Sequence, residues 1–200
     1  MHVASLPLGP YGTNCYIVRP EESADCVVID PGEEPERVLA ALSESGLRCA
    51  AILVTHAHLD HIGAVGAVAR AATCPVYTSP GDAAVLRDIN DHLWPGFGPY
   101  EPHDPEGRLV AGERLELAGL AIDVLATPGH RPDAVSLLLT GPDGSQVLAS
   151  GDVLFAGSVG RTDLEGGDWD VLEESIGLLL RACEPDTTVL PTSIAAAPNH

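Results

Sequence analysis

The chain has 200 residues, of which 45% are apolar and 20% are charged, a composition typical of a globular protein with one sizeable core. Acidic residues outnumber basic ones by 29 to 10, every basic residue is arginine, and the formal net charge is -19. These scattered arginines argue against nucleic acid and against a polybasic membrane anchor as partners, because both require clustered positive charge. We expect one domain spanning residues 1–200.

The cysteines and the N-terminal segment suggest a cellular compartment. Five cysteines occur without a Cys-x-x-Cys spacing, which is typical of reduced, mostly buried thiols. The first residues lack a charged region followed by a long apolar core, and no stretch approaches transmembrane length. We therefore expect a cytoplasmic protein with no membrane partner, although a mature secreted form would show the same features.

The N-terminal half of the chain alternates predicted strands with predicted helices. Segments rich in β-branched residues and bounded by turn residues mark the strands, and apolar residues at three- and four-residue spacing mark the helices. The expected elements are strands at 14–18, 26–30, 50–54 and 76–78 and helices at 33–46, 62–72 and 80–88. Because residues 50–54 are apolar throughout, we expect this strand to be buried on both faces.

The C-terminal half begins with an irregular segment. Residues 90–107 are rich in Pro, Gly and aromatic residues and follow neither period, which predicts a loop. Its aromatic residues Trp94, Phe97 and Tyr100 would either line a substrate pocket or anchor the loop. The elements expected beyond it are strands at 114–117, 121–126, 134–139, 146–150 and 187–190 and a helix after Asp168 with the apolar stripe Trp169, Leu172, Ile176, Leu179 and Leu180.

Strand pairs followed by helices occur in both halves of the chain, a pattern that predicts two packed β-sheets with helices outside them. The strand at 50–54 leads directly into a segment that contains His56, His58, Asp60 and His61. Imidazole and carboxylate ligands together suit zinc, iron or manganese. A lone histidine is usually a core or surface residue, but three histidines and an aspartate after a buried strand indicate a metal site.

Two further candidate ligands follow the ends of other predicted strands. His130 comes after Thr127-Pro128-Gly129, and Asp152 comes after Ser150-Gly151. Rigid scaffolds build sites where strand ends converge, so we expect both side chains to join the cluster.

The residues 56–61 match the signature His-x-His-x-Asp-His of the metallo-β-lactamase superfamily. The segments 29–32, 127–130 and 151–163 extend the likeness over nearly the whole chain, which resembles the small glyoxalase II-like (hydroxyacylglutathione hydrolase-like) branch of that superfamily. The resemblance implies an α+β fold, the αββα sandwich of two packed mixed β-sheets flanked by helices. It also implies roles for seven residues: His56, His58 and His130 bind one metal, Asp60 and His61 bind a second, Asp152 bridges both, and Asp30 supports the ligands from behind.

The reaction implied by the resemblance is cleavage of S-(2-hydroxyacyl) thiol conjugates, such as S-lactoylglutathione, with zinc as the expected cofactor and iron or manganese as alternatives. One or two ions per chain would polarise the carbonyl and supply a metal-bound hydroxide at neutral pH, with Asp60 as the catalytic carboxylate. The thiolate leaves without a strong general acid because a thiol has a pKa of about 8.5.

One part of the family pattern is missing. The family ends its last strand with Pro-Gly-His, whose histidine completes the second metal site, whereas here Pro191 is followed by Thr192 and Ser193. Three interpretations remain open: a weaker second site, a single metal, or replacement of the missing ligand by His200.

Other functions fit parts of the pattern. His56, His130 and Asp152 form a two-histidine, one-carboxylate set of the kind that holds non-haem iron, and persulfide dioxygenases of this superfamily also share the run 160–163. This run would otherwise be a buried Arg161–Asp163 ion pair that braces the Asp152 loop. A non-catalytic binding or structural domain is a third possibility. A lactamase or a nuclease is less favoured, because the chain lacks a secretion signal and a basic surface.

The remaining candidate residues are an arginine, two histidines and two cysteines. Arg131 replaces the threonine that usually follows Thr-Pro-Gly-His, and it would either meet an anionic substrate or lie on the surface. We expect His92 and His103 to be exposed. We interpret Cys15 and Cys26 as small strand residues rather than nucleophiles, because neither has an activating base nearby in the sequence.

Overall fold

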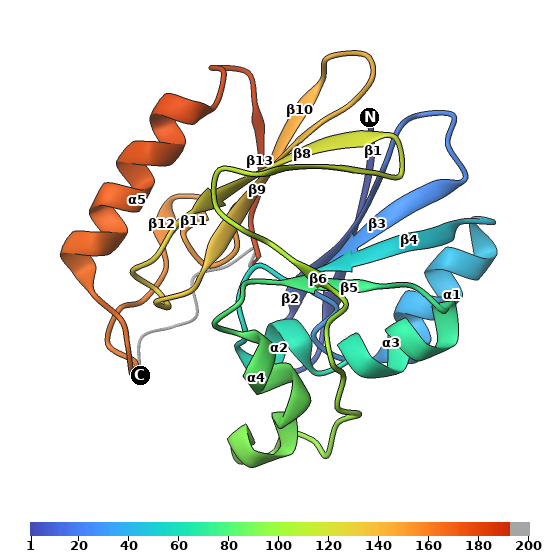
Figure 1. The fold of residues 1–200 in the computed structure, drawn as a ribbon, viewed down its shortest axis with the longest axis horizontal. Helices are drawn as coiled ribbons and strands as arrows, with labels where there is room; N and C mark the ends of the chain where they lie inside the picture. The colour runs from blue at the N-terminus through green and yellow to red at the C-terminus, as the bar shows by residue number, and fades with distance from the viewer. Residues whose placement is uncertain (193–200) are drawn as a thin grey trace.

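The computed structural model describes residues 1–192 and arranges them in four layers, with helices outside two packed sheets (Figure 1). The first sheet has six strands in chain order: β1 (His2–Leu8), β2 (Thr13–Arg19), β3 (Asp25–Ile29), β4 (Arg48–Leu53), β5 (Val76–Thr78) and β6 (Gly107–Arg108). The pairs β1–β2 and β2–β3 are antiparallel, whereas the pairs from β3 to β6 are parallel. The first sheet is therefore mixed.

The second sheet is also mixed. Its strand order is β13-β10-β9-β8-β7, and only the pair β10–β13 is parallel. The strands are β7 (Arg114–Leu117), β8 (Leu120–Ala126), β9 (Val135–Thr140), β10 (Gln146–Ala149) and β13 (Thr188–Leu190), and a separate hairpin joins β11 (Leu154–Phe155) to β12 (Ser158–Val159).

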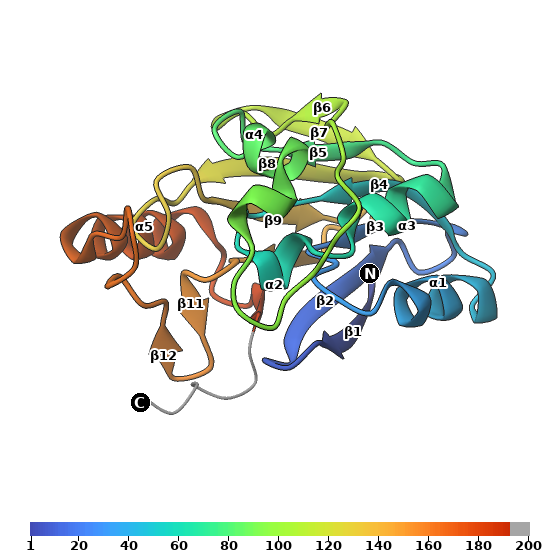
Figure 2. The same cartoon turned by 90° about the horizontal axis from the view of Figure 1, so that it is seen from below.

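The helices cover the outer faces of both sheets. The elements α1 (Pro35–Glu44), α2 (Leu59–Ile62), α3 (Val65–Ala72), α4 (Ala83–Arg87) and the 3-10 helix η1 (Ile89–His92) lie on the first sheet, and α5 (Trp169–Ala182) lies on the second. Figure 2 shows α5 on one side of the sheets and α1 and α3 on the other. The predicted α+β sandwich of two mixed sheets between helices is confirmed.

Three apolar clusters hold these layers together. One lies between the first sheet and its helices, a second lies between the two sheets, where Leu53 and Leu137 are fully buried, and a third lies between the second sheet and α5. The middle cluster explains why β4 is apolar on both faces, since its residues alternate between the helix-facing and the sheet-facing clusters. It fixes β4 in the interior, and the residues after β4 start from a rigid base.

The structure corrects three expectations about the elements. The stripe predicted for α5 is too wide: Leu172 and Leu179 are buried, but Trp169 and Leu180 are 53% and 73% exposed. The helix predicted over 62–72 is interrupted after α2 and resumes as α3. Strand β1 had no prediction because Pro7 weakens the strand pattern, and the structure places it at a sheet edge, where a missing N–H is tolerated.

The lengths of the helices and the state of the cysteines bear on the predicted compartment. Within residues 1–192, no helix combines the length and apolar character needed to cross a membrane. All five cysteines are free, and four of them are buried.

Candidate metal centre

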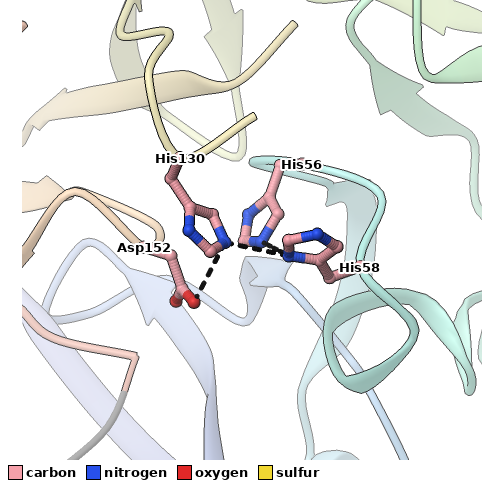
Figure 3. A group of neighbouring side chains, drawn as sticks. All are labelled: His56, His58, His130 and Asp152. Carbon is pink, nitrogen blue, oxygen red and sulfur yellow. Dashed lines mark hydrogen bonds and ion pairs between the residues drawn. The ribbon is translucent and has the colours of Figure 1, made fainter. Parts of the chain in front are cut away.

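The predicted ligands come from three loops that follow strand ends (Figure 3). His56 and His58 follow β4, His130 follows β8, and Asp152 follows β10. His58 Nδ1 lies 3.1 Å from His56 Nε2 and 2.9 Å from His130 Nε2, and His130 Nε2 lies 3.3 Å from Asp152 Oδ2. One ligand atom from each of these four residues lies within 4.8 Å of the others, so together they could hold one metal ion. We call these four residues the primary group.

The other predicted ligands adjoin the primary group at Asp152 and at His56, whose ring is 4.0 Å from the His61 ring. His61 Nε2 is 3.3 Å from Asp152 Oδ1 and 3.7 Å from Asp60 Oδ2. We call Asp60 and His61 the secondary group, which contacts the primary group through Asp152 Oδ1. Within residues 1–192, His61 Nε2 is buried and has no hydrogen-bond partner. A buried imidazole nitrogen that has no hydrogen-bond partner and faces two carboxylates is typical of a metal ligand.

Asp30 lies behind the histidines and contacts the residues that hold them. Its carboxylate is buried and accepts from the backbone N–H of Thr55 at 2.7 Å, from the Thr55 hydroxyl at 2.6 Å and from His61 Nδ1 at 2.9 Å. The Thr55 oxygen in turn lies 3.1 Å from His56 Nδ1. Because Nδ1 donates in both rings, Nε2 is the nitrogen left to bind a metal, in His56 directly and in His61 after it has released its proton.

His130 is oriented by the segment 160–163, but through its backbone. His130 Nδ1 donates to the carbonyl oxygen of Arg161 at 2.7 Å. The side chain of Arg161 pairs with Asp163 as expected, but these side chains are 61% and 68% exposed, so the expectation that the pair is buried is wrong. A Cβ at Gly160 would lie 1.8 Å from the carbonyl oxygen of Asp152, and this close approach requires glycine.

Two threonines that the sequence analysis missed donate to the carboxylates of the cluster. Thr13 donates to Asp60 Oδ2 at 2.7 Å, and Thr192 donates to Asp152 Oδ1 at 2.5 Å. Thr192 is buried, and its carbonyl accepts from the backbone N–H of Asn14 at 2.7 Å. Both hydroxyls therefore meet carboxylate oxygens near His61. Ser193 and His200, the residues on which the interpretations of the missing ligand depend, lie outside the described residues.

A buried aspartate joins the loops that carry the histidines. Asp82 accepts from the backbone N–H of Ala57 at 3.2 Å and from the Arg131 guanidinium at 3.0 Å, and it is fully buried. Arg131 is thus committed to an ion pair rather than free on the surface. Burial raises the pKa of Asp82, and the charge of Arg131 opposes that rise. Asp82 links the turn between His56 and His58 to the turn that carries His130.

The electrostatics of the cluster suit a cation. Burial and the neighbouring imidazoles lower the pKa of His58 to about 3, and that of His56 also falls well below its usual value. Burial alone would lower the pKa of His61, but Asp60 and Asp152 outweigh it and raise that pKa. Burial alone would raise the pKa of Asp152, but His61 and His130 outweigh it and lower that pKa. Neutral His56 and His58 and ionised Asp152 are the forms that bind metal.

The remaining candidates lie around the cluster. The Trp94 ring is 5.6 Å from the His58 ring, whereas Tyr100 donates its hydroxyl to Glu33 and anchors the loop. His92 is exposed as expected, but His103 is partly buried beside Glu106. Burial raises the pKa of the Cys15 thiol and raises that of Cys26 to about 12, so neither forms a ready nucleophile.

A model described as the metallo-beta-lactamase superfamily matches residues 8–190, and the chain belongs to that superfamily. The chain is 35% identical over 190 residues to the "Probable metallo-hydrolase YqgX" of Bacillus subtilis, a match that covers 92% of this chain and 86% of that protein. It is 28% identical over 195 residues to "Hydroxyacylglutathione hydrolase GloC" of Haemophilus influenzae. This match covers 95% of this chain and 89% of that protein.

Solved structures share the fold. The chain superposes on the "BLEG-1 B3 metallo-beta-lactamase" with a TM-score of 0.84 and 35% identity, covering 94% of this chain and 90% of that one. For "TTHA1623 in a di-iron-bound form" the TM-score is 0.78, the identity 40%, and the coverage 94% and 91%. For "ETHE1 from Myxococcus xanthus" the TM-score is 0.75 and the identity is 27%, and the match covers 96% of this chain and 76% of that one. The fold and the cluster define a metal-binding protein of a mostly hydrolytic superfamily.

Proposed function

We propose that the protein is a metal-dependent thioester hydrolase of the hydroxyacylglutathione hydrolase type, acting on S-(2-hydroxyacyl) conjugates of a small thiol. The observation that carries this proposal is the primary group, three imidazoles and one carboxylate with ligand atoms within 4.8 Å of one another. The similarity to a hydroxyacylglutathione hydrolase supports the choice of substrate. Zinc is the proposed ion, because three imidazoles and a carboxylate match its preferences, and iron or manganese would fit the same donors.

The protein side chains supply binding and orientation. A divalent ion in this site supplies Lewis-acid polarisation of the substrate carbonyl and a nucleophile at neutral pH. Asp30 and the Arg161 carbonyl fix the imidazoles, and Asp82 holds their loops at a constant separation. The Asp60 carboxylate is held by Thr13 through one oxygen, and its other oxygen is available to accept a proton from an attacking water.

The leaving group explains why a thioester suits this site. A thiol has a pKa of about 8.5, so its thiolate departs near neutral pH without a strong acid. The carboxylates Asp60 and Asp152 face the cluster, and the guanidinium groups of Arg131 and Arg161 are paired with the carboxylates of Asp82 and Asp163. A reaction that needs little protonation of the leaving group fits such a site. Four buried thiols, unpaired, fit a reducing compartment such as the cytoplasm.

A second candidate is an iron-dependent persulfide dioxygenase. His56, His130 and Asp152 form a two-histidine, one-carboxylate set, and the similarity to the ETHE1 structure supports it. His58 argues for the hydrolase, because its Nδ1 lies 3.1 Å and 2.9 Å from the other two imidazole nitrogens and adds a third imidazole to the same group.

Purified protein loaded with zinc, iron or manganese tests both candidates. The hydrolase should release free thiol from S-lactoylglutathione, measured with a thiol-reactive dye, and the matched variant His130→Ala should not. Oxygen uptake with glutathione persulfide and bound iron, in the absence of thioester cleavage, would instead establish the dioxygenase. Absence of thiol release with all three metals would reject the hydrolase.

A further inference from the structure

Three aromatic side chains form a row beside the primary group. The Trp94 ring lies 5.6 Å from the His58 ring, the Phe97 ring packs edge-to-face on Trp94 at 5.6 Å, and the Tyr11 ring lies 5.5 Å from Phe97. The chain has only two Phe, two Trp and four Tyr, so this row concentrates scarce side chains at one place. We call Trp94, Phe97 and Tyr11 the aromatic row.

One end of the aromatic row contacts the His/Asp cluster, and the other end is linked to it through the chain. At one end Trp94 lies beside His58. At the other end Tyr11 belongs to the turn before β2, and Thr13, the first residue of β2, donates to Asp60. Figure 2 shows the segment between α4 and β6 passing alongside α2, which carries Asp60 and His61. The row therefore borders the cluster at His58.

The aromatic row is anchored on one side and open on the other. Trp94 and Phe97 are partly buried because they pack against the cluster between the first sheet and its helices. Tyr11 is 60% exposed. Rigid aromatic rings with one free face are suited to contact an apolar ligand, since little conformational freedom is lost on binding.

The arginine side chains near this row are already paired with carboxylates and are poorly suited to bind a charged ligand. Arg131 is paired with Asp82 and Arg161 is paired with Asp163, and the chain has no lysine and a net charge of -19. A ligand group that lies along the row would therefore be held by apolar contact rather than by ion pairing.

We infer that the aromatic row is an acyl subsite, which accepts an aromatic or bulky apolar substituent on the 2-carbon of the acyl group, next to the carbonyl. This inference rests on the proposed function. The reacting carbonyl must lie at the cluster, and the substituent is two bonds from the carbonyl carbon, so it stays within a few ångströms of the cluster. The Trp94 ring, 5.6 Å from the His58 ring, is at such a distance. The thiol portion, on the other side of the carbonyl, can extend away from the row.

Two thioesters that differ only in the acyl substituent test the inference. S-mandeloylglutathione carries a phenyl ring where S-lactoylglutathione carries a methyl group. The zinc-loaded protein should cleave the mandeloyl thioester with about tenfold higher kcat/KM, a discrimination that an apolar pocket can supply. Phe97→Ala and Tyr11→Ala should lower kcat/KM for the mandeloyl thioester much more than for the lactoyl thioester and so remove most of this preference, while the zinc content per chain stays unchanged.

The matched control is Trp169→Phe, because Trp169 is an exposed aromatic residue on α5. This variant should keep the preference for the mandeloyl thioester. Equal kcat/KM values for the two thioesters in the wild-type protein would overturn the inference. An equal loss on both thioesters in Phe97→Ala and Tyr11→Ala would also overturn it, since that result indicates a structural role.

A binding measurement separates failure of the subsite from failure of the proposed function. Trp169→Phe leaves Trp94 as the single tryptophan, so its fluorescence reports directly on the row. Mandelate should quench it saturably and bind the zinc-loaded variant about tenfold more tightly than lactate. Selective mandelate binding without any thioester cleavage would retain the subsite and reject the hydrolase, whereas equal binding of the two acids would reject the subsite.

Discussion

The primary and secondary groups of the cluster share Asp152 but are supported differently. In the primary group, His130 is oriented by a carbonyl oxygen and His56 by the Thr55 hydroxyl, and Asp152 presents Oδ2 at 3.3 Å from His130 Nε2. In the secondary group, the carboxylate oxygens nearest His61 already accept from threonine hydroxyls. Similar residue types thus give one group ready to bind a cation and one whose oxygens are partly engaged.

The largest expected effect comes from removing a ligand of the primary group. His130→Ala removes the imidazole between His58 and Asp152, and we expect zinc affinity to fall by more than about 100-fold, beyond the loss typical of supporting residues. Calorimetric zinc titration measures this change. His92→Ala, at an exposed histidine, is the control. Full zinc occupancy in His130→Ala would contradict the ligand assignment.

Zinc titration of the metal-free protein compares the two groups directly. The first equivalent should bind tightly, and a second equivalent should bind at least about 100-fold more weakly, because His61 must first release a proton and two oxygens are engaged by threonine. Metal analysis after dialysis should then give one zinc per chain. Two equivalents of equal affinity would remove the proposed difference between the groups.

Asp82 tests whether the primary group depends on support from outside the cluster. Asp82→Ala removes the link between Ala57 and Arg131, and we expect about tenfold weaker zinc binding, as for other residues that orient ligands. Asp82→Asn keeps an oxygen for the Ala57 N–H and should lose less. The control is Asp123→Asn, in the exposed pair with Arg114. Unchanged zinc affinity together with a lower melting temperature would show that Asp82 acts on stability alone.

The smallest expected effect concerns the threonine at the secondary group. Thr192→Val removes the hydroxyl that donates to Asp152 Oδ1, and freeing this oxygen should strengthen binding of the second zinc about fivefold, the equivalent of about 1 kcal/mol for one hydrogen bond. Thr192→Ser keeps the donor and should behave as the wild type. Weaker second binding in Thr192→Val would show that the hydroxyl orients the carboxylate for the ion.

The sequence predicts what depends on local spacing. The segment 56–61 places its side chains within one turn after a buried strand, so no long-range packing is needed to propose that they cluster. The strand and helix periods likewise give most elements of the sandwich, because each pattern reports which face of an element is buried. The elements that escaped prediction are short or lie at edges, such as β1, β6, β11 and β12, where burial leaves little pattern.

The sequence by itself therefore determined the residue types of the cluster, the strand ends that carry them and the α+β class. Only the tertiary structure decided which oxygens remain free for a cation. The contacts that decide it join residues far apart in the chain: Thr13 with Asp60, Thr192 with Asp152, and Asp82 with Ala57 and Arg131. Such contacts depend on how sheets and loops pack against one another, and a linear pattern does not encode the separation of two loops in space.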